Sequence, residues 1–195
     1  FSSFHKLQVN VAVFLRLQDY GRRRSGGTPT PPRTGRIGVD ELIRARDCII
    51  ATVQRCYFGD EFRDITAGRN VSRNSPIWKY KPAIMSGILR VTGRLATSSF
   101  AFEWKHPAVL PSQGHVTELL IGDAHILRGH GTVQMVLCQL RQSYHIPRSK
   151  QAVKRVVDRC LNCKRFTQRL LQQEMADLPL VRLETHRPAF HNTGC

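Results

Sequence analysis

Two pairs of potential metal ligands place the strongest constraint on how this chain folds. Cys160 and Cys163 form a C-x2-C pair in "CLNC", and His125 and His130 form an H-x4-H pair in "HILRGH". Twenty-nine residues separate the two pairs. Two imidazoles and two thiolates make up a tetrahedral donor set of the kind that binds Zn²⁺. A fold that closes this site must bring the two distant pairs into contact.

The C-x2-C pair alone is ambiguous, because a redox-active dithiol has the same spacing. No βαβ pattern surrounds Cys160 and Cys163, which argues against a redox fold. All four donors lie in one short helix-rich segment, and a unit of that size commonly needs a metal or a disulfide for stability. A closed four-ligand site leaves no position for water, so we predict one structural zinc ion. Thiol exchange at the two cysteines is the alternative enzymatic hypothesis.

The other cysteines and the nearby histidines are expected to have packing roles. Free cysteine behaves as a small hydrophobic residue, so a position in an apolar helical pattern is explained by packing. This interpretation covers Cys48, Cys56 and Cys138. Three further histidines near the proposed site are expected to be surface or packing residues, namely His106, His115 and His145.

The N-terminal third of the chain predicts two helices and a linker. Residues 1–20 have helical spacing with one apolar side, made of Leu7, Val11, Phe14 and Leu15. Residues 21–36, "GRRRSGGTPTPPRTGR", are rich in Gly, Pro and Arg and are predicted to form a flexible basic linker. A second helix is predicted from Val39 to Phe58, with Asp40 as its N-cap.

The remainder of the chain predicts a strand pair and three short helices. Residues 87–95 and 106–111 are β-prone and predict antiparallel strands against which Trp104 packs. Thr132 and Ser149 are candidate caps of the second and third helices. The apolar stripes are Val116, Leu119, Leu120 and Leu127, then Val133, Val136, Leu137 and Leu140, then Val153, Val156 and Val157.

Together these patterns predict a mainly α fold. Its centre is a small three-helix zinc-binding bundle of helix-turn-helix type, preceded by an extension that contains a short β-hairpin and by an N-terminal helix and linker region. The predicted divisions of the chain are 1–36 (helix and basic linker), 37–66 (helix), 67–112 (strand-containing extension), 113–178 (zinc-binding domain) and 179–195 (linker).

The charge of the chain points to a polyanionic partner. The formal net charge is +16, which favours nucleic acid first and an acidic membrane surface second. Nine basic residues and one acid lie between Arg141 and Arg169, so the third helix pairs an apolar stripe with a basic face. A solubilising helix face is the alternative. The residues expected to contact nucleic acid, mainly at phosphates, are Arg148, Lys150, Lys154, Arg155, Arg159, Lys164 and Arg165.

The pattern H-x4-H-x29-C-x2-C in a basic, helical segment resembles the zinc-binding N-terminal domain of retroviral and retrotransposon integrases. The stretches "ILRVTGRL", "KHPAVLP", "LRQSYHIPRSKQAVKRVVDRCLNCKRF" and "QQEMADLP" are similar to the integrase region of BEL/Pao-type long-terminal-repeat retrotransposon polyproteins. The resemblance covers roughly residues 37–195. It implies a three-helix bundle in which one zinc ion is held by His125, His130, Cys160 and Cys163.

Two departures from the family pattern bear on function. The family usually has Trp at the position of His145, which predicts looser packing of the second helix. The chain also ends at "HNTGC", where relatives lead into a catalytic core with an Asp-Asp-Glu metal triad. The acids that are present sit in the wrong context for that triad: Asp158, Glu174, Asp177 and Glu184. No catalytic residue is therefore expected, and the chain is not expected to be an enzyme.

The resulting hypothesis is a zinc-binding, DNA-binding and oligomerisation module of a retrotransposon integrase, without its catalytic core. The expected partners are DNA, chiefly the phosphates of transposon ends, and other integrase subunits, with no membrane and no small-molecule substrate. The expected location is intracellular, in the nucleus or in a nucleoprotein particle. The alternative is a transposon-derived zinc module that mediates protein contacts without DNA integration.

Overall fold

The computed structural model describes residues 2–25, 35–93, 98–167, 174–178, 183 and 188. The helices are α1 (Phe4–Ser25), α2 (Val39–Tyr57), α3 (Gly59–Thr66), α4 (Phe102–Lys105), α5 (His115–Leu127), α6 (Val133–Arg141), α7 (Ser149–Val157) and α8 (Leu161–Thr167), with a 3-10 turn, η1, at Trp78–Tyr80. The strands are β1 (Pro82–Met85), β2 (Ile88–Val91), β3 (Ala108–Val109) and β4 (Tyr144–His145). The prediction of a mainly α fold is confirmed.

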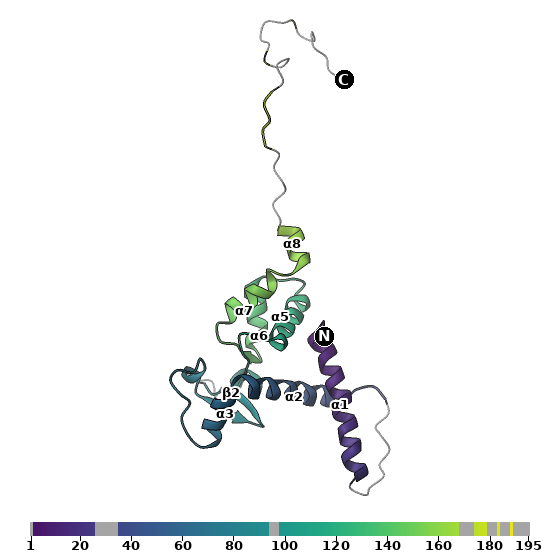
Figure 1. The fold of residues 1–195 in the computed structure, drawn as a ribbon, viewed down its shortest axis with the longest axis vertical. Helices are drawn as coiled ribbons and strands as arrows, with labels where there is room; N and C mark the ends of the chain where they lie inside the picture. Colours follow the sequence, from purple (N-terminus) through teal and green to yellow (C-terminus); the bar gives the residue numbers. More distant parts are fainter. Residues whose placement is uncertain are drawn as a thin grey trace.

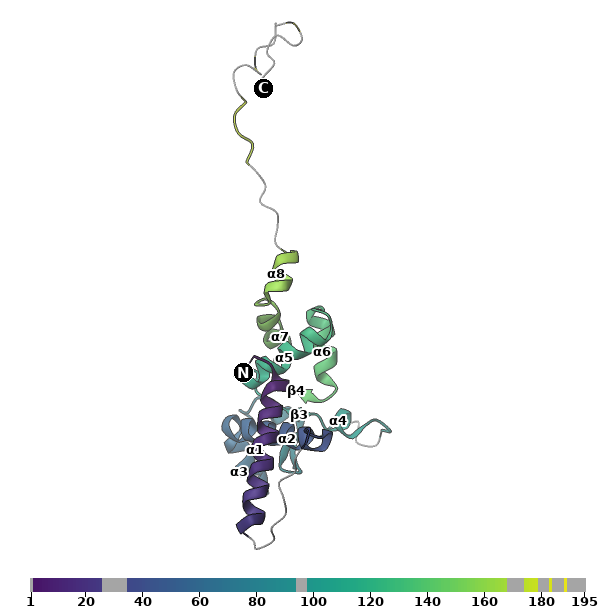
Figure 2. The same cartoon turned by 90° about the vertical axis from the view of Figure 1, so that its right-hand side faces the viewer.

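The bundle of α5, α6 and α7 lies above α2, and α1 crosses α2 at one end (Figure 1). The strands and α3 lie at the opposite end of α2, and α8 extends from the bundle on the side away from α2. The start of α1 reaches α5, as Figure 2 shows from the side. Within the described ranges, no helix combines the length and apolar character needed to cross a membrane.

The buried side of α1 differs from the predicted stripe. Leu7 and Val11 pack against the core as expected, but Phe14 is 65% exposed. Phe4 and Ala12 are buried instead. The helix α1 contacts both α2 and α5, and these tertiary partners decide which of its residues are buried.

The start of the predicted linker and the predicted N-cap of the helix that follows it need correction. The helix α1 continues through residues 21–25, where the arginines are good helix formers. The rest of the predicted flexible segment, 26–34, lies outside the described residues. On its far side α2 begins at Val39 as predicted, but its N-cap is Gly38 and not Asp40. The Gly38 N–H donates to the Glu41 carboxylate at 2.9 Å, and Glu41 also forms an ion pair with Arg16 of α1.

The predicted antiparallel strand pair is confirmed and belongs to a larger sheet with the order β1-β2-β3-β4. β2 pairs with β3 at Arg90 and Ala108, but its full length pairs with β1. Ser86 and Gly87, with φ values of 52° and 75°, form the two-residue turn that joins β1 to β2. β1 was not predicted from the sequence.

The fourth strand comes from the bundle and joins it to the extension. β4 pairs with β3 in parallel. The Ala108 N–H donates to the Ser143 carbonyl, and the Leu110 N–H donates to the His145 carbonyl, both at 2.9 Å. Glu103 strengthens this junction, because it accepts from Arg46 of α2 at 2.7 Å and from the Ser143 hydroxyl at 3.0 Å.

Four residues predicted to pack are exposed instead. Trp104 is 46% exposed, and its ring contacts Phe100 at a centroid distance of 5.7 Å. The three cysteines assigned to helix packing are also exposed, namely Cys48, Cys56 and Cys138. The buried residues of the two helices are others, including Ile49 and Ile50 in α2 and Val136 and Leu137 in α6. Helical spacing alone does not show which side of a helix other elements will cover.

The three predicted bundle helices are confirmed, and all but one of their eleven stripe residues are buried or partly buried. Leu127 is the exception at 75% exposure, because it ends α5 beyond the core. The bundle core continues into α2, β2 and the segment after β3, where it includes Ile49, Ile88 and Leu110. The predicted domain boundary at residue 112 stays a prediction. Core residues that precede this position pack against core residues that follow it.

The predicted caps of α6 and α7 differ in outcome. Thr132 caps α6 as predicted, since its hydroxyl accepts from the Met135 N–H at 3.4 Å. Ser149 is not a cap. It is the first residue of α7, and the N-cap is Arg148, which has a left-handed backbone with φ of 53°. Residues 142–148, including β4, connect α6 to α7, so the connection is longer than a helix-turn-helix turn.

Gln54 of α2 is fully buried and joins two strands of the sheet. Its side-chain NH2 donates to the carbonyls of Leu89 and Val109 at 2.8 and 2.7 Å. Its side-chain carbonyl accepts from the Leu89 N–H at 2.7 Å. One side-chain amide therefore provides hydrogen-bond partners for backbone groups of both β2 and β3. Buried polar groups without such partners would destabilise the fold.

We expect Gln54→Leu to lower the free energy of unfolding by roughly 2 to 4 kcal/mol, because it leaves the Leu89 N–H and two carbonyls without partners. Chemical denaturation followed by circular dichroism measures the change. Gln151→Leu, at an exposed position on α7, is the matched control. Equal stability of the two variants would contradict the bridging role of Gln54.

Candidate metal centre

The end of α5 brings the two histidines together. The His130 N–H donates to the His125 carbonyl, and the Gly129 N–H donates to the Ile126 carbonyl, both at 2.9 Å. This is the Schellman arrangement, in which a left-handed residue, here Gly129 with φ of 60°, closes the helix. This closure places His125, the third residue from the end of α5, beside His130, the second residue after the C-cap Arg128. The H-x4-H spacing matches these two positions, so a helix end aligns both imidazoles.

The start of α8 brings the two cysteines together. The Lys164 N–H donates to the Cys160 carbonyl at 3.0 Å, which is the first helical hydrogen bond of α8. Cys160 therefore holds the N-cap position and Cys163 the third helical position. The C-x2-C spacing is the N-cap to N3 spacing, in which a cap side chain accepts from the backbone N–H three residues on. α8 was not predicted from the sequence.

The four donor atoms meet as the sequence predicted. Nδ1 of His130 lies 3.2 Å from Nε2 of His125 and 3.3 Å from the Cys160 sulfur. The Cys163 sulfur lies 3.2 Å from the His125 nitrogen and 4.0 Å from the His130 nitrogen. All four donor atoms lie within 4.8 Å of one another. Zn–N bonds of about 2.0 Å and Zn–S bonds of about 2.3 Å give tetrahedral edges of roughly 3.3 to 3.8 Å, so the donors fit one zinc ion.

Each imidazole has a second partner that orients it. His125 is 3% exposed, and its Nδ1 faces the Gly131 carbonyl at 3.2 Å, so that nitrogen carries the proton and Nε2 keeps its lone pair. A side chain at Gly131 would lie 3.2 Å from the Arg128 carbonyl, which explains the glycine. The outer nitrogen of His130 lies 3.2 Å from the side-chain amide of Asn162.

Asn162 is a site residue that the sequence analysis missed. When Nδ1 of His130 binds a metal, Nε2 carries the proton and must donate, so the amide oxygen of Asn162 is the partner. The nitrogen and oxygen of an amide exchange places on a half-turn, which preserves this contact. The available signal was the position of Asn162 between the two cysteines.

The pKa directions of His125 and Cys160 favour metal binding, whereas the pKa direction of Cys163 opposes it. Burial lowers the pKa of His125, with a smaller contribution from the charge of His130, so the imidazole stays neutral. The Cys163 backbone N–H lowers the pKa of the Cys160 thiol by hydrogen bonding to its sulfur, whereas burial raises the pKa of Cys163. A metal ion lowers a thiol pKa further, because the thiolate is the ligand.

His106, His115 and His145 lie outside this cluster, as predicted. His115 is exposed, and Nδ1 of His106 faces the Val91 carbonyl at 3.3 Å. His145 is partly buried, and its ring packs on Tyr80 at a centroid distance of 4.0 Å. The predicted loosening at His145 is not tested, but an aromatic contact is present at that position.

The predicted nucleic-acid residues fall into two groups. Two interact within the protein: Arg155 donates to the Ser112 carbonyl at 2.8 Å, and Arg159 lies 3.7 Å from the Glu118 carboxylate. The other five are exposed, and none forms an ion pair with a described residue. They are Arg148, Lys150, Lys154, Lys164 and Arg165.

Comparison with known proteins supports the zinc assignment. Residues 113–169 match the family model described as integrase zinc binding domain, and this segment contains all four donors. The segment is therefore an integrase zinc-binding domain. Comparisons with curated proteins and with solved structures give no match.

We expect Cys163→Ser to abolish stoichiometric zinc binding and to reduce the helical signal of residues 113–165, because metal binding supplies folding free energy. Zinc content and far-UV circular dichroism with and without a chelator measure both effects. Cys138→Ser, an exposed cysteine outside the cluster, is the control. Full helicity of the Cys163 variant without zinc would exclude a structural role for the metal.

Asn162→Ala is expected to weaken zinc binding roughly 10- to 100-fold, because an outer partner of a ligating histidine is lost. Asn162→Asp keeps an acceptor for the His130 N–H and should retain most of the affinity. Competition with a colorimetric chelator gives both constants. Equal weakening by the two substitutions would show that the contact does not orient His130.

Proposed function

We propose that this chain is a zinc-stabilised DNA-binding and self-association module of a retrotransposon integrase. The proposal of DNA binding is carried by the five exposed cations, which lie at the N-cap of α7, on α7 and on α8. None of them forms an ion pair with a described acid. The integrase zinc-binding domain at residues 113–169 provides the class of protein. Assignment to the BEL/Pao type rests on the sequence resemblance.

The arrangement of these cations suits phosphate contacts. Lys150 and Lys154 are four residues apart and lie on one face of α7. Arg141, Arg148 and Lys150 line a hollow of about 500 Å³ beside the start of this helix. Long flexible cations around a hollow contact the DNA backbone without reading bases, so the affinity should depend strongly on salt.

Self-association is supported by exposed apolar side chains around the metal centre. Ile126 and Leu127 at the end of α5 are 62% and 75% exposed, and Leu161 and Phe166 of α8 are 70% and 91% exposed. Exposed large apolar side chains of this kind are suited to protein contacts. The same surface supports the alternative function, a zinc module that binds only proteins, and salt dependence distinguishes the two.

The proposal assigns no catalytic step to this chain. The zinc-binding domain is not the catalytic core of an integrase, and a closed four-ligand site offers no position for an activated water. The role proposed for the metal is to hold α5 and α8 together. The proposed location is the nucleus or a nucleoprotein particle, where a DNA-binding integrase module meets its ligand.

Lys150→Ala combined with Lys154→Ala should weaken binding to duplex DNA and reduce the slope of log K against log salt by about 2, since each phosphate contact contributes about 0.9. Fluorescence anisotropy over a series of salt concentrations measures the slope. Lys6→Ala combined with Arg55→Ala removes the same charge from exposed positions on α1 and α2 and is the control. An identical slope in both double variants would contradict the proposed contact face.

A further inference from the structure

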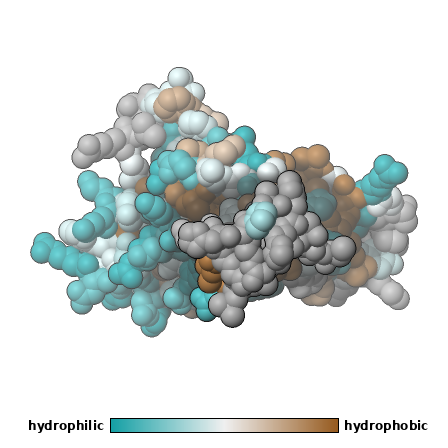
Figure 3. All heavy atoms as spheres, turned by 90° about the horizontal axis from the view of Figure 1, so that it is seen from above, coloured by the Kyte–Doolittle hydropathy of each residue, from teal (hydrophilic) through white to brown (hydrophobic). Residues whose placement is uncertain are grey.

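The segment before the zinc domain has an unusual charge balance. From Ile65 to Phe102 there is no Asp or Glu, whereas six residues are basic: Arg69, Arg73, Lys79, Lys81, Arg90 and Arg94. Hydrophilic residues gather on the left of Figure 3, the side on which Figure 1 places α3 and the strands. The basic character of the chain therefore extends beyond the bundle into the extension.

Four of these cations line one groove. The groove lies between the end of α3, η1 and the first strand, with a volume of about 920 Å³. Arg69, Arg73, Lys79 and Lys81 all contribute to its walls. Arg69 shares its charge with Asp64 at 3.0 Å, so the other three cations give the groove its net positive charge.

An exposed indole lies in the same groove. The turn η1 follows Ile77, which is fully buried, and leaves Trp78 38% exposed. The guanidinium of Arg73 lies 5.7 Å from the Trp78 ring centroid. The buried side chain of Ile77 anchors this turn in the core, and the indole of Trp78 stays at the basic surface. An aromatic ring in this position can stack with a flat ligand.

We propose that this groove binds an unpaired strand of nucleic acid. Its phosphates contact Arg73, Lys79 and Lys81, and a base stacks on Trp78. A basic groove with an aromatic platform is the general solution for binding single strands without sequence preference. A duplex fits less well, because its bases already stack on one another and do not present a face to the indole.

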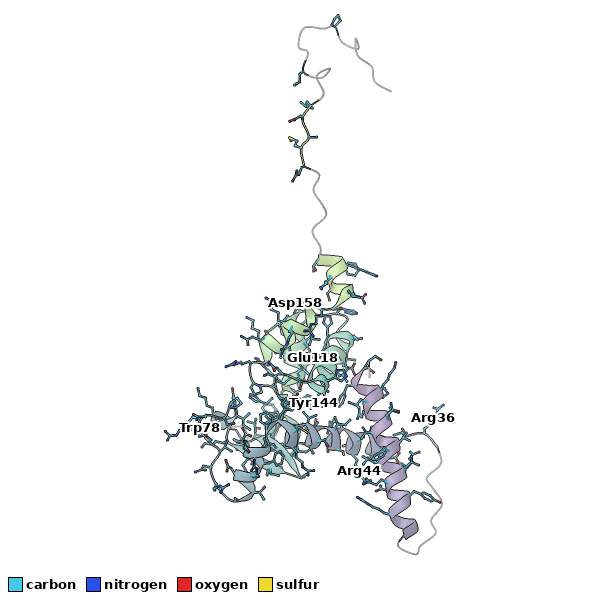
Figure 4. All side chains as sticks on the ribbon, viewed as in Figure 1. Arg36, Arg44, Trp78, Glu118, Tyr144 and Asp158 are labelled. Atoms are coloured by element: carbon cyan, nitrogen blue, oxygen red, sulfur yellow. The ribbon has the colours of Figure 1, made fainter. Side chains whose placement is uncertain are left out.

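This site is separate from the duplex contacts proposed for α7 and does not rest on them. Trp78 lies at the outer edge of the extension in Figure 4, apart from Glu118 and Asp158 of the bundle. The groove is built from α3, η1 and β1, and it contains none of the five exposed bundle cations. The chain thus presents two nucleic-acid surfaces with different ligand preferences.

The two tryptophans of the full chain, Trp78 and Trp104, allow a direct test. In Trp104→Phe, a short oligothymidylate should quench the fluorescence of Trp78 in a saturable, salt-dependent manner. In Trp78→Phe, the same titration should leave the emission of Trp104 unchanged. Trp78→Ala should weaken oligothymidylate binding, measured by anisotropy, roughly tenfold or more, because base stacking is lost.

Three outcomes would overturn the proposal. They are the absence of quenching in Trp104→Phe, equal quenching by a polyglutamate of the same charge, and loss of quenching in the Lys150→Ala, Lys154→Ala background. Quenching that persists in that background supports a separate site. Duplex binding measured on the same proteins tests the function proposed above, so either idea can fail without the other.

Discussion

The contact between the end of α5 and the start of α8 is the interaction on which the zinc domain depends. The Schellman closure at Gly129 places the two histidine ligands side by side, and the N-cap at Cys160 does the same for the two cysteine ligands. Backbone hydrogen bonds fix both arrangements. A metal ion between them then needs little rearrangement of either pair. Since α8 has no buried residue, its attachment to the bundle has few apolar contacts to rely on, and the metal provides the missing link.

A second constraint joins this domain to the extension. β4, which lies between α6 and α7, completes the sheet of the extension through parallel pairing with β3. Gln54 ties the same sheet to α2, and the hydrophobic core runs from α1 to α7 without interruption. The zinc domain therefore rests on the extension as part of one packed structure, and α7 has a defined position relative to η1.

The sequence predicted the metal centre better than the rest of the fold, for a physical reason. Ligand chemistry depends on a few side chains at fixed spacings, so His125 and Cys163 could be assigned without knowing what connects them. The bundle helices were also visible, because their stripes are strongly periodic. Cys48 and Trp104 were misassigned because exposure is decided by tertiary partners. The strand β1 and the contact of Asn162 were missed because pairing and outer-shell contacts depend on residues distant in sequence.

The position of η1 bears on how the two proposed nucleic-acid surfaces act together. Trp78 lines the groove of the extension, whereas Tyr80, two residues later, lines the hollow shared by Arg148 and Lys150 and packs on His145. One short turn thus borders both basic surfaces. Because β3 and β4 hold these surfaces in a fixed relation, a nucleic acid that has an unpaired end and an adjoining duplex offers one ligand to each surface. The arrangement suits a DNA end, where single and double strands meet, better than a continuous duplex.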